Sequence, residues 1–232
     1  SLGDANTLEP VRRFTHGAAA RGAVFSNTGR RIVSVGDDRV ARIWDAFSGE
    51  LLFTYAGHEG SIWMASFAPD GSAFVTAAAD GQARLWRPDV RQDQLAVTLK
   101  GHTGTVRSVA FSPNGRYVAT ASYTAQDPTA RIWDARSGRL LRVINAGVTQ
   151  SVAFSPDGRL LATAQVDTAQ ARIWDWENCS LEPGDACEEG APMQHGARVM
   201  DVMFSADGRD IITASRDNLS QIWRLDNRAT PR

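Results

Sequence analysis

Histidine, serine and aspartate recur in this sequence at spacings that would allow an active site. His102, Ser122 and Asp127 are the residue types of a nucleophilic triad, in which an imidazole activates a hydroxyl. However, each of the four histidines of the chain lies nine residues before a phenylalanine. The four histidines are His16, His58, His102 and His195. A set of residues copied along the chain indicates a structural role, because an enzyme needs one active site.

The phenylalanines belong to a five-residue phrase that occurs five times. Its clearest copy is Phe-Ser-Pro-Asp-Gly at 154–158, and the copies start at residues 25, 67, 111, 154 and 204, at intervals of 42, 44, 43 and 50. Proline, aspartate or asparagine, and glycine in this order are typical of a tight β-turn. The phrase therefore predicts five hairpins at a regular period.

Alternating apolar and small or polar residues flank each turn, which predicts two strands per repeat. A third strand ends in tryptophan at positions 44, 86, 133, 174 and 223, and a fourth strand follows a glycine-containing turn. Four short strands in about 40–45 residues are the period of one propeller blade. We therefore predict an all-β chain.

The repeats resemble the WD-repeat family of β-propellers. Gly57-His58 and Gly101-His102 open a repeat, and Trp44-Asp45, Trp133-Asp134 and Trp174-Asp175 close one, so the resemblance covers residues 10–226. It implies one domain over residues 1–232 with five four-stranded antiparallel blades. The predicted units are 16–56, 57–100, 101–144, 145–193, and 194–226 together with 9–15.

The last repeat stops after its third strand, and a spare strand stands at the other end of the chain. Residues 9–16 align with residues 50–58, which predicts that the N-terminal strand completes the last blade. We expect a closed ring of five blades. Two alternatives are a part of a larger propeller and an open arc that pairs with another copy.

The resemblance also assigns the histidines to a buried hydrogen-bonded tetrad of Trp, Ser or Thr, His and Asp. Such a network stabilises polar groups that would otherwise be buried unpaired. Gly36 and Ala78 stand at the predicted hydroxyl position of the first two blades, and Asn145 and Gln165 replace His and Ser in the fourth, so we expect broken tetrads there. The complete tetrads are predicted to be His102, Ser122, Asp127 and Trp133, and His195, Ser215, Asp217 and Trp223.

Partners of WD-repeat propellers often bind over the narrow end of the channel, so the resemblance implies a binding surface there. It is lined by the residue five after each histidine and the residue before each aspartate. The arginines make this surface basic, which favours an acidic or phosphorylated peptide, and Trp63 is either a binding anchor or a plug for the channel. The predicted binding residues are Arg21, Asp37, Trp63, Arg107, Gln126, Gln150, Arg198, Met200 and Arg216.

Overall charge and motifs favour a protein-binding role. Lys+Arg 25 and Asp+Glu 26 give a net charge of -1, so we expect neither a nucleic-acid nor a membrane partner. We find no motif for a nucleotide, a catalytic metal or calcium, and expect no cofactor and no metal. We predict a scaffold or sensor module, free-standing or part of a larger regulatory protein. The alternative is a hydrolase or lyase in the channel, which would need converging carboxylates and a base.

Three features bear on origin and compartment. Cys179 and Cys187 flank a Pro-Gly turn and either form a disulfide or remain free thiols. The first residues lack a secretory signal, so we expect a cytoplasmic protein, or an extracytoplasmic one if the cysteines are bonded. Lys100 is the only lysine beside many arginines, which is typical of a GC-rich genome and leads us to expect a bacterial source.

Overall fold

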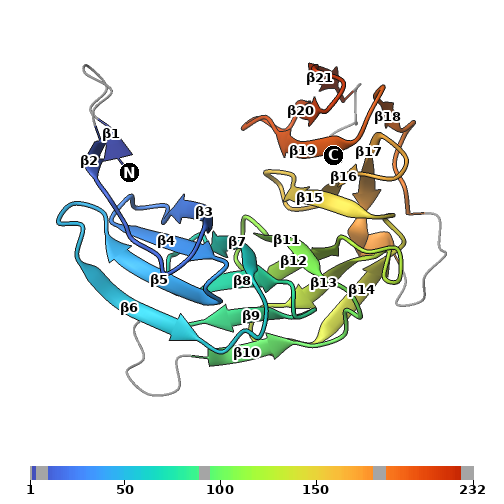
Figure 1. The fold of residues 1–232 in the computed structure, drawn as a ribbon. Coiled ribbons are helices and arrows are strands. Elements are labelled where there is room, and N and C mark those ends of the chain that lie inside the picture. Colours follow the sequence, from blue (N-terminus) through green and yellow to red (C-terminus); the bar gives the residue numbers. More distant parts are fainter. Residues whose placement is uncertain (1, 4–9, 89–94, 180–186, 226–232) are drawn as a thin grey trace.

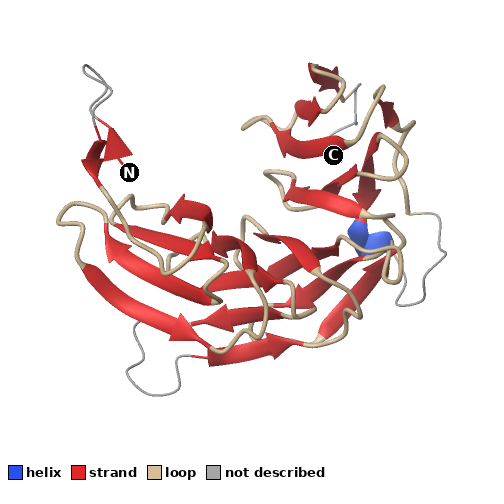
Figure 2. Ribbon diagram, in the orientation of Figure 1, coloured by secondary structure: helices blue, strands red, loops and turns tan. Residues whose placement is uncertain are grey.

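Alternating side chains and tight turns produce the predicted all-β chain. The computed structural model describes residues 2–3, 10–88, 95–179 and 187–225, and its sheets follow one another along an arc (Figure 1). Figure 2 shows strands throughout, apart from one short 3-10 helix. In the part of the chain that is described, no helix is long and apolar enough to cross a membrane.

Each blade is an antiparallel sheet in which strands pair in chain order. The first contains β3 (Ala20–Phe25), β4 (Arg31–Gly36), β5 (Val40–Asp45) and β6 (Leu51–Ala56). The second contains β7 (Ile62–Phe67), β8 (Phe74–Ala78), β9 (Ala83–Trp86) and β10 (Leu95–Leu99). The third contains β11 (Val106–Phe111), β12 (Tyr117–Ser122), β13 (Ala130–Asp134) and β14 (Leu140–Ile144). The fourth contains β15 (Thr149–Phe154), β16 (Leu160–Gln165), β17 (Gln170–Asp175) and β18 (Met193–Gln194). The last contains β19 (Val199–Phe204), β20 (Asp210–Ser215) and β21 (Ser220–Arg224).

The repeated five-residue phrase forms the turn between the first two strands of each blade, as predicted. In the fourth blade the N–H of Gly158 donates to the carbonyl of Ser155 at 2.8 Å. Gly158 has a φ of 77°, which a residue without Cβ adopts at little cost. The Ser155 hydroxyl donates to the Asp157 carboxylate and fixes the same turn.

The hydrophobic core lies between neighbouring sheets. Val33 and Ile43 of the first sheet pack with Phe67, Phe74 and Trp86 of the second. The same arrangement joins the second sheet to the third, the third to the fourth, and the fourth to the fifth. We call the side of a sheet that packs on the next sheet its forward face, and the opposite side its rear face.

The last blade corrects the prediction that the N-terminal strand completes it. The sheet β19–β20–β21 has three strands, and β2 (Pro10–Arg12) pairs with β1 (Leu2–Gly3). The first and last sheets form the two ends of the arc in Figure 1, so the predicted closed ring of five blades is wrong. Ring closure depends on how far each sheet is rotated from the previous one, which the alignment of residues 9–16 does not encode.

A disulfide lies at the outer edge of the fourth blade. Cys179 and Cys187 are bonded and buried, next to the helix η1 (Trp176–Asn178). Trp176 packs edge-on against Tyr117 of the third blade at 4.8 Å and donates to the Gly158 carbonyl. Trp176 therefore packs across the junction between the third and fourth blades.

Candidate functional site

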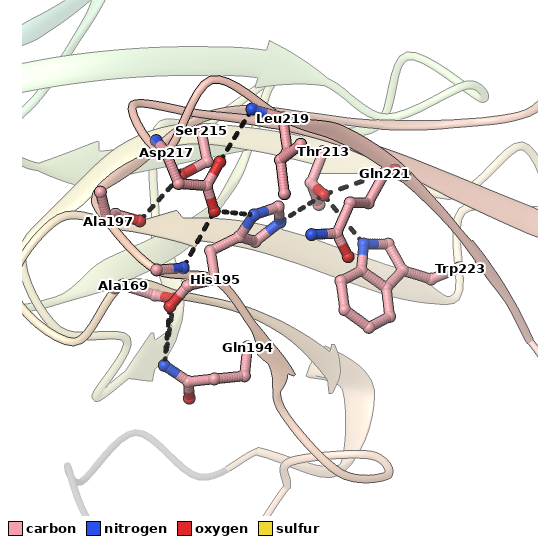
Figure 3. Close-up of polar contacts among 11 residues, drawn as sticks. Ala169, Gln194, His195, Ala197, Thr213, Ser215, Asp217, Leu219, Gln221 and Trp223 are labelled. Carbon is pink, nitrogen blue, oxygen red and sulfur yellow. Dashed lines mark hydrogen bonds and ion pairs between the residues drawn. The ribbon is translucent and has the colours of Figure 1, made fainter.

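The tetrad of the last blade shows what the recurring histidines do (Figure 3). The indole N–H of Trp223 donates to Thr213 Oγ1 at 2.8 Å, and this hydroxyl lies 2.7 Å from His195 Nε2. His195 Nδ1 lies 3.0 Å from the Asp217 carboxylate, which also accepts the backbone N–H of Gly196. The network ties the third strand, the second strand and the segment before the first strand into one unit.

The first three blades contain the same network. In the third blade, His102 Nε2 lies 2.7 Å from Thr120 Oγ1, and His102 Nδ1 lies 2.7 Å from Asp127. Trp133 donates to the same threonine at 2.8 Å. The first and second blades place their hydroxyls likewise between histidine and tryptophan. These sets are His16, Ser34, Asp38 and Trp44, and His58, Thr76, Asp80 and Trp86.

The structure corrects the hydroxyl position in every tetrad. Thr120 and Thr213 occupy the places predicted for Ser122 and Ser215, which instead contact Thr124 and the Ala197 carbonyl. Side chains two residues apart in a strand point to the same face, so alternation does not distinguish the two positions. The expectation of broken tetrads at Gly36 and Ala78 is wrong for the same reason.

The fourth blade lacks a histidine, as predicted. Trp174 still donates to Thr163 Oγ1 at 2.9 Å. The Gln165 amide donates to the Ala146 carbonyl and accepts from the Thr168 hydroxyl. Gln165 therefore satisfies buried polar groups of its own, and the exposed Asn145 takes no part in this network.

Burial and hydrogen bonding set the protonation of these networks. Burial lowers the pKa of His102 below 6.5, although Asp127 opposes this effect. Burial raises the pKa of Asp127, but hydrogen bonds from His102, Thr129 and the Thr103 N–H outweigh it and hold the pKa well below its usual range. The pair is thus a neutral imidazole beside a carboxylate, and both ring nitrogens of His102 are hydrogen-bonded inside the blade.

The predicted binding residues of the first set share one backbone feature. The first strands of neighbouring sheets contact one another along the inside of the arc. The register of each of these strands shifts at one residue, which is a β-bulge that re-aims a side chain. The residues at the five bulges are Arg21, Trp63, Arg107, Gln150 and Met200.

The second set follows the end of each second strand. The backbone N–H of the first residue after this strand donates to the backbone carbonyl of the residue that precedes the first strand, two residues before the bulge. In the first blade the N–H of Asp37 donates to the carbonyl of Ala19 at 2.9 Å. In the third blade this residue is Tyr123, not Gln126, because a longer loop separates the strand from Asp127. Gln126 is exposed in that loop. Counting forward from the strand end, instead of back from the aspartate, would have identified Tyr123.

Trp63 is the centre of this surface. The guanidinium carbons Cζ of Arg21 and Arg107 each lie 4.8 Å from the centroid of its ring. Arg21 makes two hydrogen bonds to Asp37, of 2.7 and 2.5 Å. Burial lowers the pKa of Arg107, Tyr123 raises it and Arg21 lowers it further. We call Arg21, Asp37, Trp63, Arg107 and Tyr123 the aromatic-arginine cluster.

The remaining predicted residues do not join this cluster. Arg198 and Arg216 lie beside each other in the last blade, linked by a backbone hydrogen bond of 3.0 Å, and both are exposed. Gln150 and Met200 occupy the bulges of the fourth and fifth blades and are half-buried. The structure therefore divides the predicted surface into a cluster on blades one to three and a basic pair on blade five.

The described residues contain no group of three or more His, Cys, Asp or Glu side chains placed to hold a metal ion. Among the described residues, two polar arrangements differ in where they lie, the histidine networks and the aromatic-arginine cluster. The first is internal to each blade, and the second reaches the surface.

Comparison with known families decides the class of protein. The model of the WD domain, G-beta repeat, matches residues 8–45, 49–87, 93–134, 138–175 and 192–224. The chain belongs to the WD-repeat family. Each matched segment contains the first three strands of one blade and the strand that precedes them in the chain, and the predicted all-β WD-repeat fold class is confirmed.

Similar curated proteins of this family are translation factors. The chain is 33% identical over 79 residues to eukaryotic translation initiation factor 3 subunit I of Aspergillus niger, and 34% identical over 79 residues to that of Pyricularia oryzae. Each alignment covers 34% of this chain and 23% of the relative, so the match spans about a quarter of the relatives' length. These species are eukaryotic, and they give no support to the expected bacterial source.

The corrected tetrad makes a stability prediction. Thr120→Val removes the hydroxyl between His102 and Trp133 and leaves two buried polar groups unpaired, so we expect the free energy of unfolding to fall by about 1–3 kcal/mol. Ser122→Ala is the matched control and should cost under about 1 kcal/mol, because its hydroxyl contacts the Thr124 hydroxyl and not the tetrad. Urea denaturation of both variants measures the difference. Equal losses would contradict the assignment of Thr120.

The lowered pKa of His102 makes a pH prediction. A histidine with a folded pKa below 6.5 binds a proton more readily in the unfolded chain, so its contribution is present at neutral pH and is lost as the pH falls below about 6.5. We expect the thermal midpoint to fall between pH 7 and pH 5, and His102→Gln to reduce that slope. The depressed pKa of Asp127 adds a further loss below about pH 4. A midpoint that rises on acidification would overturn this account.

Proposed function

We propose that this WD-repeat chain is a protein-interaction module that binds an acidic or phosphorylated peptide through the aromatic-arginine cluster. The observation that carries the proposal is the position of Trp63 between the guanidinium groups of Arg21 and Arg107. A guanidinium held against an indole has lost much of its rotamer freedom before a ligand arrives. The cluster is therefore prepared to bind an anion with little further ordering.

The charges of the cluster favour a carboxylate or phosphate. Arg21 is already paired with Asp37, whereas Arg107 makes no ion pair within the described residues and is half-buried. The pKa of Arg107 is lowered by burial and by the like charge of Arg21. An anionic group beside Arg107 would relieve this repulsion and could accept two parallel hydrogen bonds.

We propose that the function is non-enzymatic. All four histidines bond hydroxyls inside their blades, so they support the fold and do not face a channel. The relatives' name describes a subunit of a larger factor, which supports a scaffold role within a larger assembly or a larger regulatory protein. The basic pair of Arg198 and Arg216 offers a second contact for a long acidic segment.

Binding of peptide libraries tests this proposal. Acidic, phosphorylated and neutral peptide sets are presented to the wild type, to Arg107→Glu and to Trp63→Ala, with Arg30→Glu as control. Arg30 is an exposed arginine in the first turn, at the opposite end of β3 from Arg21, so the control changes the same charge away from the cluster.

We expect the wild type and Arg30→Glu to retain acidic or phosphorylated peptides, and Arg107→Glu to lose about 2 kcal/mol of binding free energy, near thirty-fold in Kd. Trp63→Ala should weaken binding similarly, since both guanidinium groups lose their support. Thermal unfolding of each variant separates lost binding from lost folding. Identical peptide profiles for wild type, Arg107→Glu and Trp63→Ala would contradict the proposal and leave Trp63 as a residue that fills the space between blades.

A further inference from the structure

The forward face of the last sheet is uncovered. Ile212 and Ile222 lie opposite each other on β20 and β21, and they are 43% and 71% exposed. The pairs at the same register in the other four sheets are at most 7% exposed. Those pairs are Val33 and Ile43, Val75 and Leu85, Ala119 and Ile132, and Ala162 and Ile173. Met203, on the neighbouring strand, is also 57% exposed.

The rear face of the first sheet is open in a complementary way. Phe25 is 47% exposed, whereas its counterparts Phe67 and Phe204 are 7% and 9% exposed and Phe111 and Phe154 are partly buried. Ala23, at the register of the buried Val109 and Val202, is exposed as well. Phe14 covers part of this face through its contact with Trp44, at 5.1 Å between ring centroids.

These two faces are the separated halves of an interface that the chain builds four times. At each internal junction the forward face presents branched or small apolar residues. The rear face that packs on it presents a tryptophan together with phenylalanine or aliphatic residues. The rear faces of blades two to five are already covered within the chain. Within the described residues, the rear face of the first blade is thus the open surface that matches the last blade.

We propose that two copies of this chain associate head to tail, with the forward face of the last blade of one copy packed on the rear face of the first blade of the other. The contact is heterologous, so a second such contact closes a ring or extends a filament.

Two complementary variants test this arrangement. Ile222→Arg blocks the forward face and Phe25→Arg blocks the rear face, and both residues are largely exposed in the single copy, so neither change should unfold it. Phe47→Arg is the control, because Phe47 is 73% exposed in the turn between β5 and β6. Sedimentation equilibrium over a wide range of protein concentration gives the mass, and circular dichroism verifies the fold.

We expect the mass of the wild type and of Phe47→Arg to rise above the 25.2 kDa of one chain as the protein concentration increases. For each face variant, we expect the dissociation constant of the complex to be at least tenfold higher. Mixing Ile222→Arg with Phe25→Arg should restore a two-chain species, because one intact forward face then meets one intact rear face. A wild type that stays monomeric throughout would overturn the proposal and indicate that other blades cover these faces. Failure of the mixture to associate would also overturn it.

Discussion

An antiparallel sheet with two apolar faces must be covered on both sides, and this requirement organises the whole molecule. A sheet must bury an apolar face against another element, and a sheet with two apolar faces needs a packed layer on each side. Here each sheet buries its forward face on the rear face of the next, so the core is a series of apolar layers between blades. In such a repeat architecture stability comes largely from contacts between neighbours. Within the described residues the middle blades pack on two neighbouring blades, and the first and last blades pack on one.

The histidine tetrads act within blades one, two, three and five, beside the apolar clusters that their tryptophans contact. The histidine, the hydroxyl and the tryptophan come from three separate segments, and the aspartate also accepts a backbone N–H beside the histidine. The segment that the aspartate holds leads into the first strand and its bulge. The internal network thereby fixes the backbone that aims Arg21, Trp63 and Arg107 at the surface, and it links the fold to the candidate binding site.

Features that follow from a local sequence pattern, such as strands and turns, were predicted correctly. Features for which one pattern fits two different structures were not. Turn residues and alternation located the strands, and the period identified the blades. Thr120 and Ser122 share a face of one strand, so counting could not choose between them, and a longer loop displaced Gln126 in favour of Tyr123. Closure of the ring was missed because it depends on the rotation between sheets. The bond between Cys179 and Cys187 was left open, because composition and spacing fit both states.

The local stability of each blade should depend on how completely its two apolar faces are covered by neighbouring blades. Native-state amide hydrogen exchange at low protein concentration measures this directly. The account predicts the strongest protection in the central strands β8, β12 and β16, and the weakest in β20 and β21, whose forward face is bare. Protection of β20 and β21 equal to that of β12 would contradict it, since an open last blade could not be as stable as a blade packed on both sides.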